Sequence, residues 1–235
     1  MKVLITIPVY NEELVLEKNI KKLFEFCVSN LADREFIIVI VNNNSSDRTG
    51  TIADELSTKY REVEHMFISS KGKGLAISSA WKKYDVDAYF FMDVDLATDI
   101  SAIPEALKEI ELGTDVVIGS RFHRDSKVDR TIGRKIISHC YRLFFKTLFK
   151  VRANDMPCGF KVINKKVRNE ILGDIKDTGF FWDTEMLVLA NKRGFDIKEI
   201  PIIWSEFIDP ERKSTVNITG TAINYIKKSL SLKMR

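Results

Sequence analysis

The sequence of 235 residues is poor in cysteine and proline and contains no long apolar run. Its three cysteines are scattered and lack CxxC spacing, which argues against a disulfide framework or a zinc site and favours a reducing, cytoplasmic setting. With five prolines, 45% hydrophobic and 30% charged residues, the composition is that of a globular protein. We expect no signal peptide and no spanning helix, which would need roughly 18 consecutive apolar residues.

The net charge of +4 is unevenly distributed along the chain. Residues 121–152 contain ten Lys/Arg and two Asp, a local charge of +8 that leaves the rest at −4. Because the positive charge is confined to residues 121–152, we expect no nucleic-acid partner. We expect this segment to bind an anionic ligand instead.

Short β-branched runs alternate with helical patterns in the first half of the chain. We expect strands at 3–9, 36–41, 64–68, 88–92 and 115–119, with helices at 12–31, 47–60, 74–83 and 103–110. The second half predicts helices at 132–151, 183–192 and 222–232 and strands at 159–163 and 196–203. This order predicts an α/β fold in one domain, with a mostly parallel sheet covered by helices on both faces and ligands beyond the carboxyl ends of its strands.

Two carboxylates, Asp93 and Asp95, follow the apolar strand at 88–92. Residues two apart in an extended chain point the same way, and paired hard oxygen ligands suit Mg²⁺ or Mn²⁺ holding a diphosphate. Aspartate pairs also serve as turn and cap residues, which is the alternative. The position after the fourth parallel strand favours the metal.

Two further polar clusters are expected at the same edge of the sheet. Pro8, Tyr10 and Glu12 supply an aromatic face and hydrogen-bonding groups, unless they only begin a helix. In the KGKG segment at 71–74, two glycines would let the backbone approach an anion that Lys71 and Lys73 neutralise, unless this is an ordinary solvated loop.

Together these clusters resemble family 2 glycosyltransferases of the GT-A fold, in particular dolichyl-phosphate mannose and glucose synthases. The matching segments, in family order, are 8–12, 41–49, 73–74, 93–95, 119–121, 155–161, 181–185 and 199–202. The resemblance implies an inverting, metal-dependent transfer of a hexose from a nucleotide-sugar. It also implies a donor site, a metal site and catalytic residues: Pro8, Tyr10, Glu12, Asn42, Asn43, Lys73 and Asp93 for the donor, Asp93 and Asp95 for the metal, and Asp95, Arg121 and Asp183 for catalysis.

The chain departs from the family pattern at several positions. Asn42 and Asn43 replace two acidic residues, so a contact with the nucleotide base would be made by an amide carbonyl. The segment Leu96-Ala97-Thr98-Asp99 resembles the glucose-type sequence, which favours UDP-glucose over GDP-mannose. Where the mannose type has Gln, Ala97 cannot complete a metal shell, so Asp99 or water would have to do so.

The predicted helix at 132–151 carries basic residues at 134, 142, 146 and 150, with Ser138 at the missing step of this i, i+4 series. It is either a surface helix packed on the core or an amphipathic helix at an anionic membrane. The resemblance implies that Arg121, Arg134 and Ser138 bind a lipid phosphate, with Arg212 and Lys213 on a mobile loop.

We therefore expect residues 1–120 to bind the nucleotide-sugar and residues 121–235 to bind dolichyl or polyprenyl phosphate. The enzyme would act as a peripheral protein at the cytoplasmic face of a membrane, on its own or with a membrane-anchoring partner. Two alternatives remain open. A saccharide hydroxyl could be the acceptor, with Asp183 as general base, or the substitutions at Asn42, Asn43 and Ala97 could mark an inactive nucleotide-sugar-binding or scaffold protein.

Overall fold

A computed structural model describes residues 1–129, 131–205 and 218–234, with side chains at all of these positions except 132, 134 and 218–223. The strands are β1 Lys2–Val9, β2 Glu35–Asn43, β3 Val63–Ile68, β4 Ala88–Met92, β5 Val116–Ser120, β6 Lys127–Asp129, β7 Phe160–Asn164, β8 Ile197–Pro201 and β9 Ile203–Ser205. The helices are α1 Leu16–Asn30, α2 Thr49–Lys59, α3 Lys73–Lys83, the 3₁₀ turn η1 Ile100–Ala102, α4 Ile103–Glu111, α5 Ile132–Phe149, α6 Lys165–Ile171, α7 Trp182–Lys192 and α8 Ile218–Met234.

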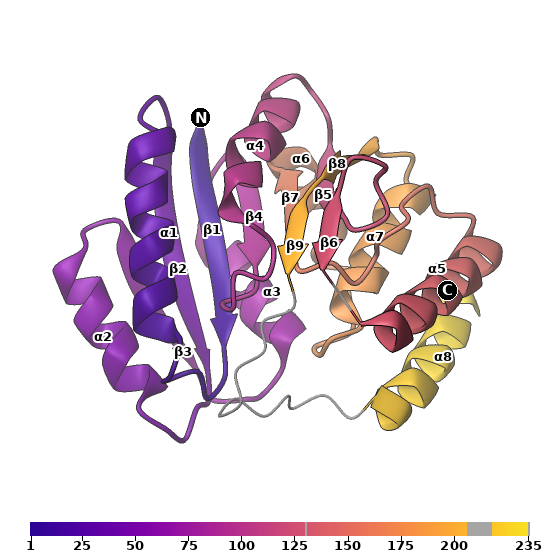
Figure 1. Ribbon diagram of the computed structural model, residues 1–235, viewed down its shortest axis with the longest axis horizontal. Helices are drawn as coiled ribbons and strands as arrows, with labels where there is room; N and C mark the ends of the chain where they lie inside the picture. Colours follow the sequence, from indigo (N-terminus) through magenta and orange to yellow (C-terminus); the bar gives the residue numbers. More distant parts are fainter. Residues whose placement is uncertain (130, 206–217, 235) are drawn as a thin grey trace.

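Seven of these strands form one twisted sheet in the order β3-β2-β1-β4-β7-β5-β8 (Figure 1). All neighbours pair in parallel except β7, which runs antiparallel between β4 and β5. The short strands β6 and β9 form a second, parallel pair. The predicted α/β class with a mostly parallel sheet is therefore confirmed.

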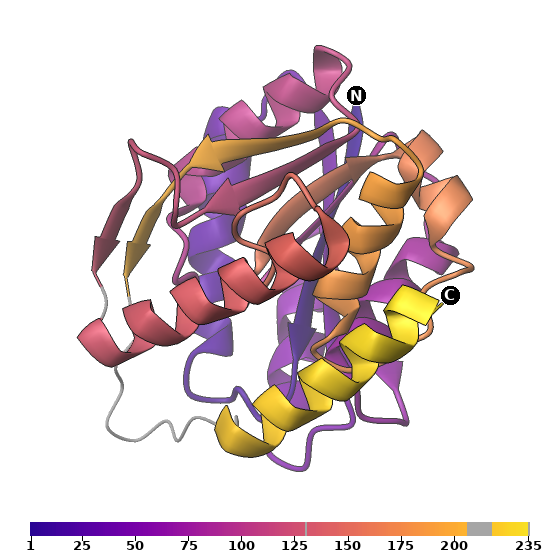
Figure 2. The same cartoon turned by 90° about the vertical axis from the view of Figure 1, so that its right-hand side faces the viewer.

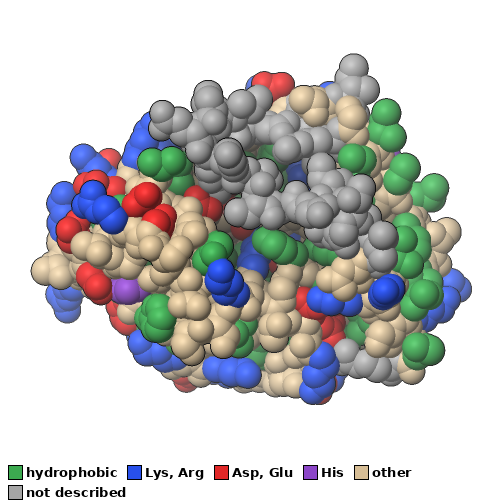
Figure 3. Space-filling model, turned by 90° about the horizontal axis from the view of Figure 1, so that it is seen from below, with side chains coloured by type: hydrophobic (Ala, Val, Ile, Leu, Met, Phe, Trp, Pro, Cys, Tyr) green, Lys and Arg blue, Asp and Glu red, His purple; other side chains and the backbone are tan. Residues whose placement is uncertain are grey.

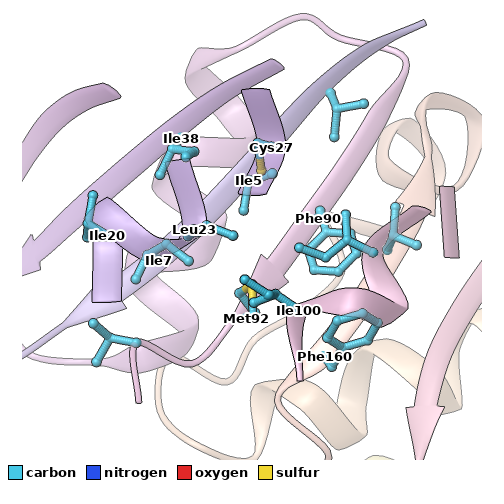
Figure 4. Packing of buried hydrophobic residues seen from close by; sticks show 14 of the residues in the cluster. Ile5, Ile7, Ile20, Leu23, Cys27, Ile38, Phe90, Met92, Ile100 and Phe160 are labelled. Carbon is cyan, nitrogen blue, oxygen red and sulfur yellow. The ribbon is translucent and has the colours of Figure 1, made fainter. Parts of the chain in front are cut away.

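Helices cover both faces of the sheet, as expected for buried strands without an alternating polar face. One core cluster joins the sheet to α1, α2 and α4, and the other joins it to α3, α5, α6, α7 and α8. Figure 4 shows the first cluster, in which Ile5, Ile7 and Ile38 from the sheet meet Ile20 and Leu23 of α1. In the same cluster the rings of Phe90 and Phe160 meet edge to face, with centroids 4.8 Å apart.

Several predicted boundaries were wrong. Helix α1 begins at Leu16 and not at residue 12, because the Glu12 carbonyl accepts hydrogen bonds from the amides of both Val15 and Leu16 in a turn before the helix. The strand expected at 196–203 is divided between β8 and β9, which belong to different sheets. Strand β6 and helix α6 were not predicted, and α8 is longer than the helix expected at 222–232.

Helices α5 and α8 lie side by side at one end of the sheet (Figures 1 and 2). Tyr141 of α5 and Tyr225 of α8 join them, with ring centroids 5.6 Å apart. No helix in the described ranges is long and apolar enough to cross a membrane.

Candidate active site

The clusters predicted after the first, second and fourth strands meet at one edge of the sheet, because β2, β1 and β4 are parallel neighbours. Pro8 is half-buried within β1, and Tyr10 and Asp93 follow the ends of β1 and β4. Glu12 is half-buried, and its amide donates to Thr49 Oγ1 at 2.8 Å. The structure thus brings most of the predicted donor residues together at this edge.

The loop after β1 is tied to the loop after β2 through Asn11. This residue has φ 55°, a left-handed conformation that asparagine tolerates better than most residues. Its Oδ1 accepts a hydrogen bond from the Ser46 amide at 2.8 Å. Next to it, the Tyr10 ring lies under the Lys71 ammonium, which is 4.3 Å from the ring centroid and donates to the Tyr10 hydroxyl. An aromatic ring and a cation therefore stand together at the expected nucleotide pocket.

Asn42 and Asn43 are buried and organise the loops around them. Asn42 Oδ1 accepts from the Ser45 amide at 3.0 Å, and Asn43 Oδ1 accepts from the Gly72 amide at 2.8 Å. Each carbonyl oxygen has a second lone pair, so a contact with a nucleotide base stays a prediction. What the structure adds is a role in holding the KGKG loop against β2.

Asp93 and Asp95 border a small pocket at the end of β4. The pocket is lined by Met92, Asp93, Asp95, Ala97, Thr98, Gly159 and Trp204. Gly159 is required for this geometry, because a Cβ atom there would lie 2.5 Å from Asp93 Cγ and would overlap Oδ2. Among the described residues, no group of three or more His, Cys, Asp or Glu could hold a metal. The pair fits Mg²⁺ or Mn²⁺ that takes its other ligands from a diphosphate and water.

The loop after Asp95 is held by β9. Thr98 forms a β-bridge with Trp204, and the Asp99 amide donates to the Ile203 carbonyl at 2.8 Å. The Asp99 carboxylate accepts from the Ser101 amide at 2.9 Å and caps η1. Asp99 is not among the residues that line the pocket, and its alternative role as a metal ligand stays a prediction.

Lys73 lies between two carboxylates. Its Nζ is 2.7 Å from Asp93 Oδ1 and 3.5 Å from Asp183 Oδ2. Burial works to lower the pKa of Lys73, but the negative charges of Asp183 and Asp93 outweigh it and hold that pKa above its usual value. Lys73 is therefore a cation beside Asp93, and it links this predicted donor residue to the predicted catalytic residue Asp183.

Asp183 is almost fully buried at the start of α7, with 4% of its surface exposed. Its second oxygen, Oδ1, is 3.7 Å from the Nζ of Lys161, which is fully buried in β7. Burial lowers the pKa of Lys161, while the charge of Asp183 acts in the opposite direction. Lys161 was not predicted as a site residue, although a lysine inside an apolar strand is a signal for a buried ionic partner.

Arg121 follows β5 and is anchored by a buried carboxylate. Its Nε and Nη2 donate to Asp155 Oδ2 and Oδ1 at 2.7 and 2.6 Å, and Asp155 is fully buried. Burial works to lower the pKa of Arg121, but the hydrogen bonds and charge of Asp155 raise it above its usual value. The guanidinium carbon is 5.4 Å from the ring centroid of Trp204, which lines the pocket of Asp93. A fixed cation therefore lies against Trp204, which lines the pocket of the carboxylate pair.

The remaining predicted residues belong to α5 or lie outside the described residues. Arg134 and Ser138 belong to α5, but the Arg134 side chain lies outside the described residues, as do Arg212 and Lys213. Helix α5 contacts Phe122, the residue after Arg121. The guanidinium carbon of Arg142, in α5, lies 5.0 Å from the Phe122 ring centroid.

The sequence profile of glycosyl transferase family 2 matches residues 4–172. The chain belongs to glycosyl transferase family 2. The predicted family and the predicted enzyme class, a glycosyltransferase, are thereby confirmed, and the family transfers sugars from nucleotide-sugar donors.

Relatives of this glycosyltransferase include enzymes named for dolichyl-phosphate acceptors. It is 32% identical over 191 residues to a dolichol-phosphate mannosyltransferase of Pyrococcus furiosus, covering 80% of this chain and 53% of the relative. It is 29% identical over 223 residues to a dolichyl-phosphate beta-glucosyltransferase of Saccharomyces cerevisiae, covering 86% and 66%. Glycosyltransferase AglD of Haloferax volcanii is 28% identical over 237 residues, covering 100% and 38%. The chain thus spans between about 38% and 66% of the length of these relatives.

Solved structures show the same fold. Glucosyl-3-phosphoglycerate synthase from Mycobacterium tuberculosis, in complex with Mn²⁺ and UDP-glucose, superimposes with a TM-score of 0.71 at 14% identity, over 99% of this chain and 78% of that one. Mannosyl-3-phosphoglycerate synthase from Rubrobacter xylanophilus gives a TM-score of 0.71 at 14% identity, over 100% and 74%. At these identities the likeness shows the fold alone, and it confirms the predicted GT-A architecture.

Proposed function

We propose that this glycosyltransferase transfers a hexose to dolichyl or polyprenyl phosphate with inversion at the anomeric carbon. UDP-glucose is the favoured donor because of the glucose-type segment 96–99, and GDP-mannose is the next. The observation that carries the proposal is the placement of the Arg121 cation against Trp204, a residue that lines the same pocket as Asp93 and Asp95. The names of the relatives support the same acceptor.

The proposed reaction does not require the protein to remove a proton from the acceptor. A phosphate monoester is largely dianionic near neutral pH, so its oxygen can attack the anomeric carbon without a general base while the bond to the nucleotide diphosphate breaks. Arg121 would bind and orient the acceptor phosphate, and Lys73 would reduce the repulsion between two anionic substrates. Asp93 and Asp95 would hold Mg²⁺ or Mn²⁺, which supplies charge stabilisation for the departing diphosphate.

Asp183 fits a positioning role better than that of a general base. Its carboxylate is buried and flanked by the ammonium groups of Lys73 and Lys161, so an acceptor hydroxyl would have to compete with two fixed cations. A saccharide acceptor needs such a base and a lipid phosphate does not. This difference favours the lipid phosphate, with residues 1–120 serving the donor and 121–235 the acceptor.

We further propose that α5 and α8 rest on the cytoplasmic surface of a membrane as a peripheral contact. Ile137 and Leu143 of α5 and Leu230 of α8 are 50%, 68% and 51% exposed. Figure 3 shows hydrophobic side chains interspersed with Lys and Arg on the side where these helices lie. Large apolar residues combined with basic ones suit an anionic lipid surface.

The activity is tested with purified protein, Mg²⁺ or Mn²⁺, dolichyl phosphate and either UDP-glucose or GDP-mannose. We expect a glycolipid product, and Asp95→Ala should abolish it while circular dichroism stays unchanged. No product with any common nucleotide-sugar would refute the proposed reaction. Product with a saccharide acceptor alone would select the alternative.

The membrane contact is tested by flotation with vesicles containing phosphatidylserine. Leu143→Asp should reduce the bound fraction, and Leu112→Asp is the matched control because Leu112 is 70% exposed but lies at the end of α4. Equal binding by both variants would exclude α5 as the contact. If the unmodified chain does not bind vesicles, a membrane-anchoring partner becomes the better explanation.

A further inference from the structure

The position of Lys73 between Asp93 and Asp183 has a consequence for metal binding. Asp93 belongs to the pair that would hold the divalent cation, and its side chain is 44% exposed. Asp183 lies on the buried side of Lys73, with its side chain 6% exposed. The Lys73 ammonium therefore pairs with Asp93, a carboxylate that the metal would need, and it also lies near a second carboxylate, Asp183.

The backbone around Lys73 is held on both sides. The Gly72 amide donates to Asn43, and the Leu75 amide donates to the Thr178 carbonyl at 2.9 Å. Gly74 packs so closely against the Trp182 side chain that no Cβ atom could be placed there. Any change of partner by Lys73 must therefore occur through its side chain.

Asp183 is a fixed acceptor for that side chain. Lys161 approaches its other oxygen and is itself fixed by a hydrogen bond to the Cys158 carbonyl. The Phe91 ring lies near both ammonium groups, with its centroid 5.3 Å from Lys73 Nζ and 5.2 Å from Lys161 Nζ. A Lys73 ammonium that leaves Asp93 therefore meets either an aromatic ring or Asp183.

We propose that Lys73 is a counter-ion shared in turn by two carboxylates, pairing with Asp93 in the absence of metal and with Asp183 when a divalent cation occupies Asp93 and Asp95. The inference rests on the proposed metal site. It makes Asp183 a positioning residue that receives the displaced ammonium. Asp183 then favours metal binding without touching the metal or accepting a proton.

The distances make this change small. Shortening the Lys73–Asp183 separation from 3.5 Å to an ordinary hydrogen bond of ~2.8 Å needs a side-chain movement of about 0.7 Å. If Asp183 were neutral, Lys73 would have to remain near Asp93, where it competes with the incoming cation and repels it. Asp183→Asn should therefore weaken metal binding, and removal of the Lys73 charge should strengthen it.

The test is a thermodynamic cycle with Mn²⁺ alone, in which electron paramagnetic resonance measures the free Mn²⁺. We expect Lys73→Met to bind Mn²⁺ about tenfold more tightly and Asp183→Asn about fivefold more weakly than the unmodified protein, within the range of ordinary couplings between sites. The double variant should bind like Lys73→Met, because Asp183 acts only through the lysine. Lys82→Met, at the far end of α3, controls for the change in net charge and should leave Mn²⁺ affinity unchanged.

Two outcomes would overturn the inference. In the first, Asp183→Asn weakens Mn²⁺ binding by the same factor whether Lys73 is present or replaced by Met. In the second, Lys73→Met binds Mn²⁺ with unchanged affinity. If Asp183→Asn is unstable because it leaves Lys161 buried beside an amide, Lys161→Met/Asp183→Asn removes that charge and should show the same weakening. If the unmodified protein binds no Mn²⁺, alone or with UDP or GDP, the metal site itself is refuted. If the unmodified protein binds Mn²⁺ but the effects of Lys73→Met and Asp183→Asn on Mn²⁺ affinity simply add in the double variant, only the change of partner by Lys73 is refuted.

Discussion

Replacing Gly159 by alanine tests whether the proposed metal site depends on the close approach of the Gly159 backbone, just before β7, to Asp93. The added methyl carbon would lie 2.5 Å from Asp93 Cγ and 3.0 Å from Oδ1, and it would overlap Oδ2. Ordinary contact between carbon atoms begins near 3.5 Å, so the carboxylate must move by about 1 Å. A displacement of that size at a reacting centre can cost ~100-fold in rate. Because Asp93 is partly exposed, it can turn into solvent and the fold should survive.

The assay compares Gly159→Ala with Gly173→Ala, a matched change where a Cβ atom meets nothing within 4 Å. We expect Gly159→Ala to lower kcat and Mn²⁺ affinity with a nearly unchanged Tm, and Gly173→Ala to leave kcat and Mn²⁺ affinity unchanged. If Gly159→Ala binds Mn²⁺ and turns over normally, Asp93 is not held as the structure shows. A large fall in Tm would instead identify Gly159 as a residue of the core.

Three further predictions concern a buried ion pair and the cysteines. Arg121→Met leaves the fully buried Asp155 carboxylate without its ion-pair partner, so urea unfolding should show a loss of about 3–5 kcal/mol, and a loss below about 1 kcal/mol would contradict a dry ion pair. Burial raises the pKa of Cys27 from 9.0 to about 12, so the unfolded chain loses the thiol proton at a lower pH than the folded protein does. The free energy of unfolding should therefore fall as pH rises from 9.0 towards 12, and it should fall less steeply in Cys27→Ala. Among the three cysteines only Cys140 is exposed, so iodoacetamide at pH 8 should label one thiol in the folded protein, and labelling of two would show that a buried site opens.

Local sequence patterns were sufficient to predict the elements whose structure is determined by the burial of apolar residues. The run Ala88 to Met92 is apolar throughout and became a strand buried on both faces, so Asp93 could be placed at its end. The same reasoning brought Tyr10 and Asn43 to that edge, because parallel strands present their carboxyl ends together. The metal residues could therefore be proposed from the strand pattern, whereas the roles given to the donor residues came from the resemblance to the family.

Long-range partners could not be predicted in this way. Nothing near Lys161 indicates that its ammonium meets Asp183, 22 positions later, and the pairing exists only because β7 enters the sheet antiparallel beside β4. Strand β6 has three residues and is formed only because β9 lies beside it. Interactions that depend on strand order carry no local signal, so Trp204 and Asp155 were also missed as parts of the site.

Charge pairing across the site explains why these missed residues matter. Arg121 is paired with Asp155, while Lys73 and Lys161 surround Asp183, so each of these three cations has a carboxylate partner that is at least nine-tenths buried. Removing a charge from water is costly, and a buried partner offsets that cost before any substrate arrives. The more exposed Asp93 is the carboxylate in this network that a metal can take over. In the proposed reaction, the buried carboxylates would orient the cations and the more exposed Asp93 would bind the metal, so that cations already in place would offset the charge of two anionic substrates in one pocket.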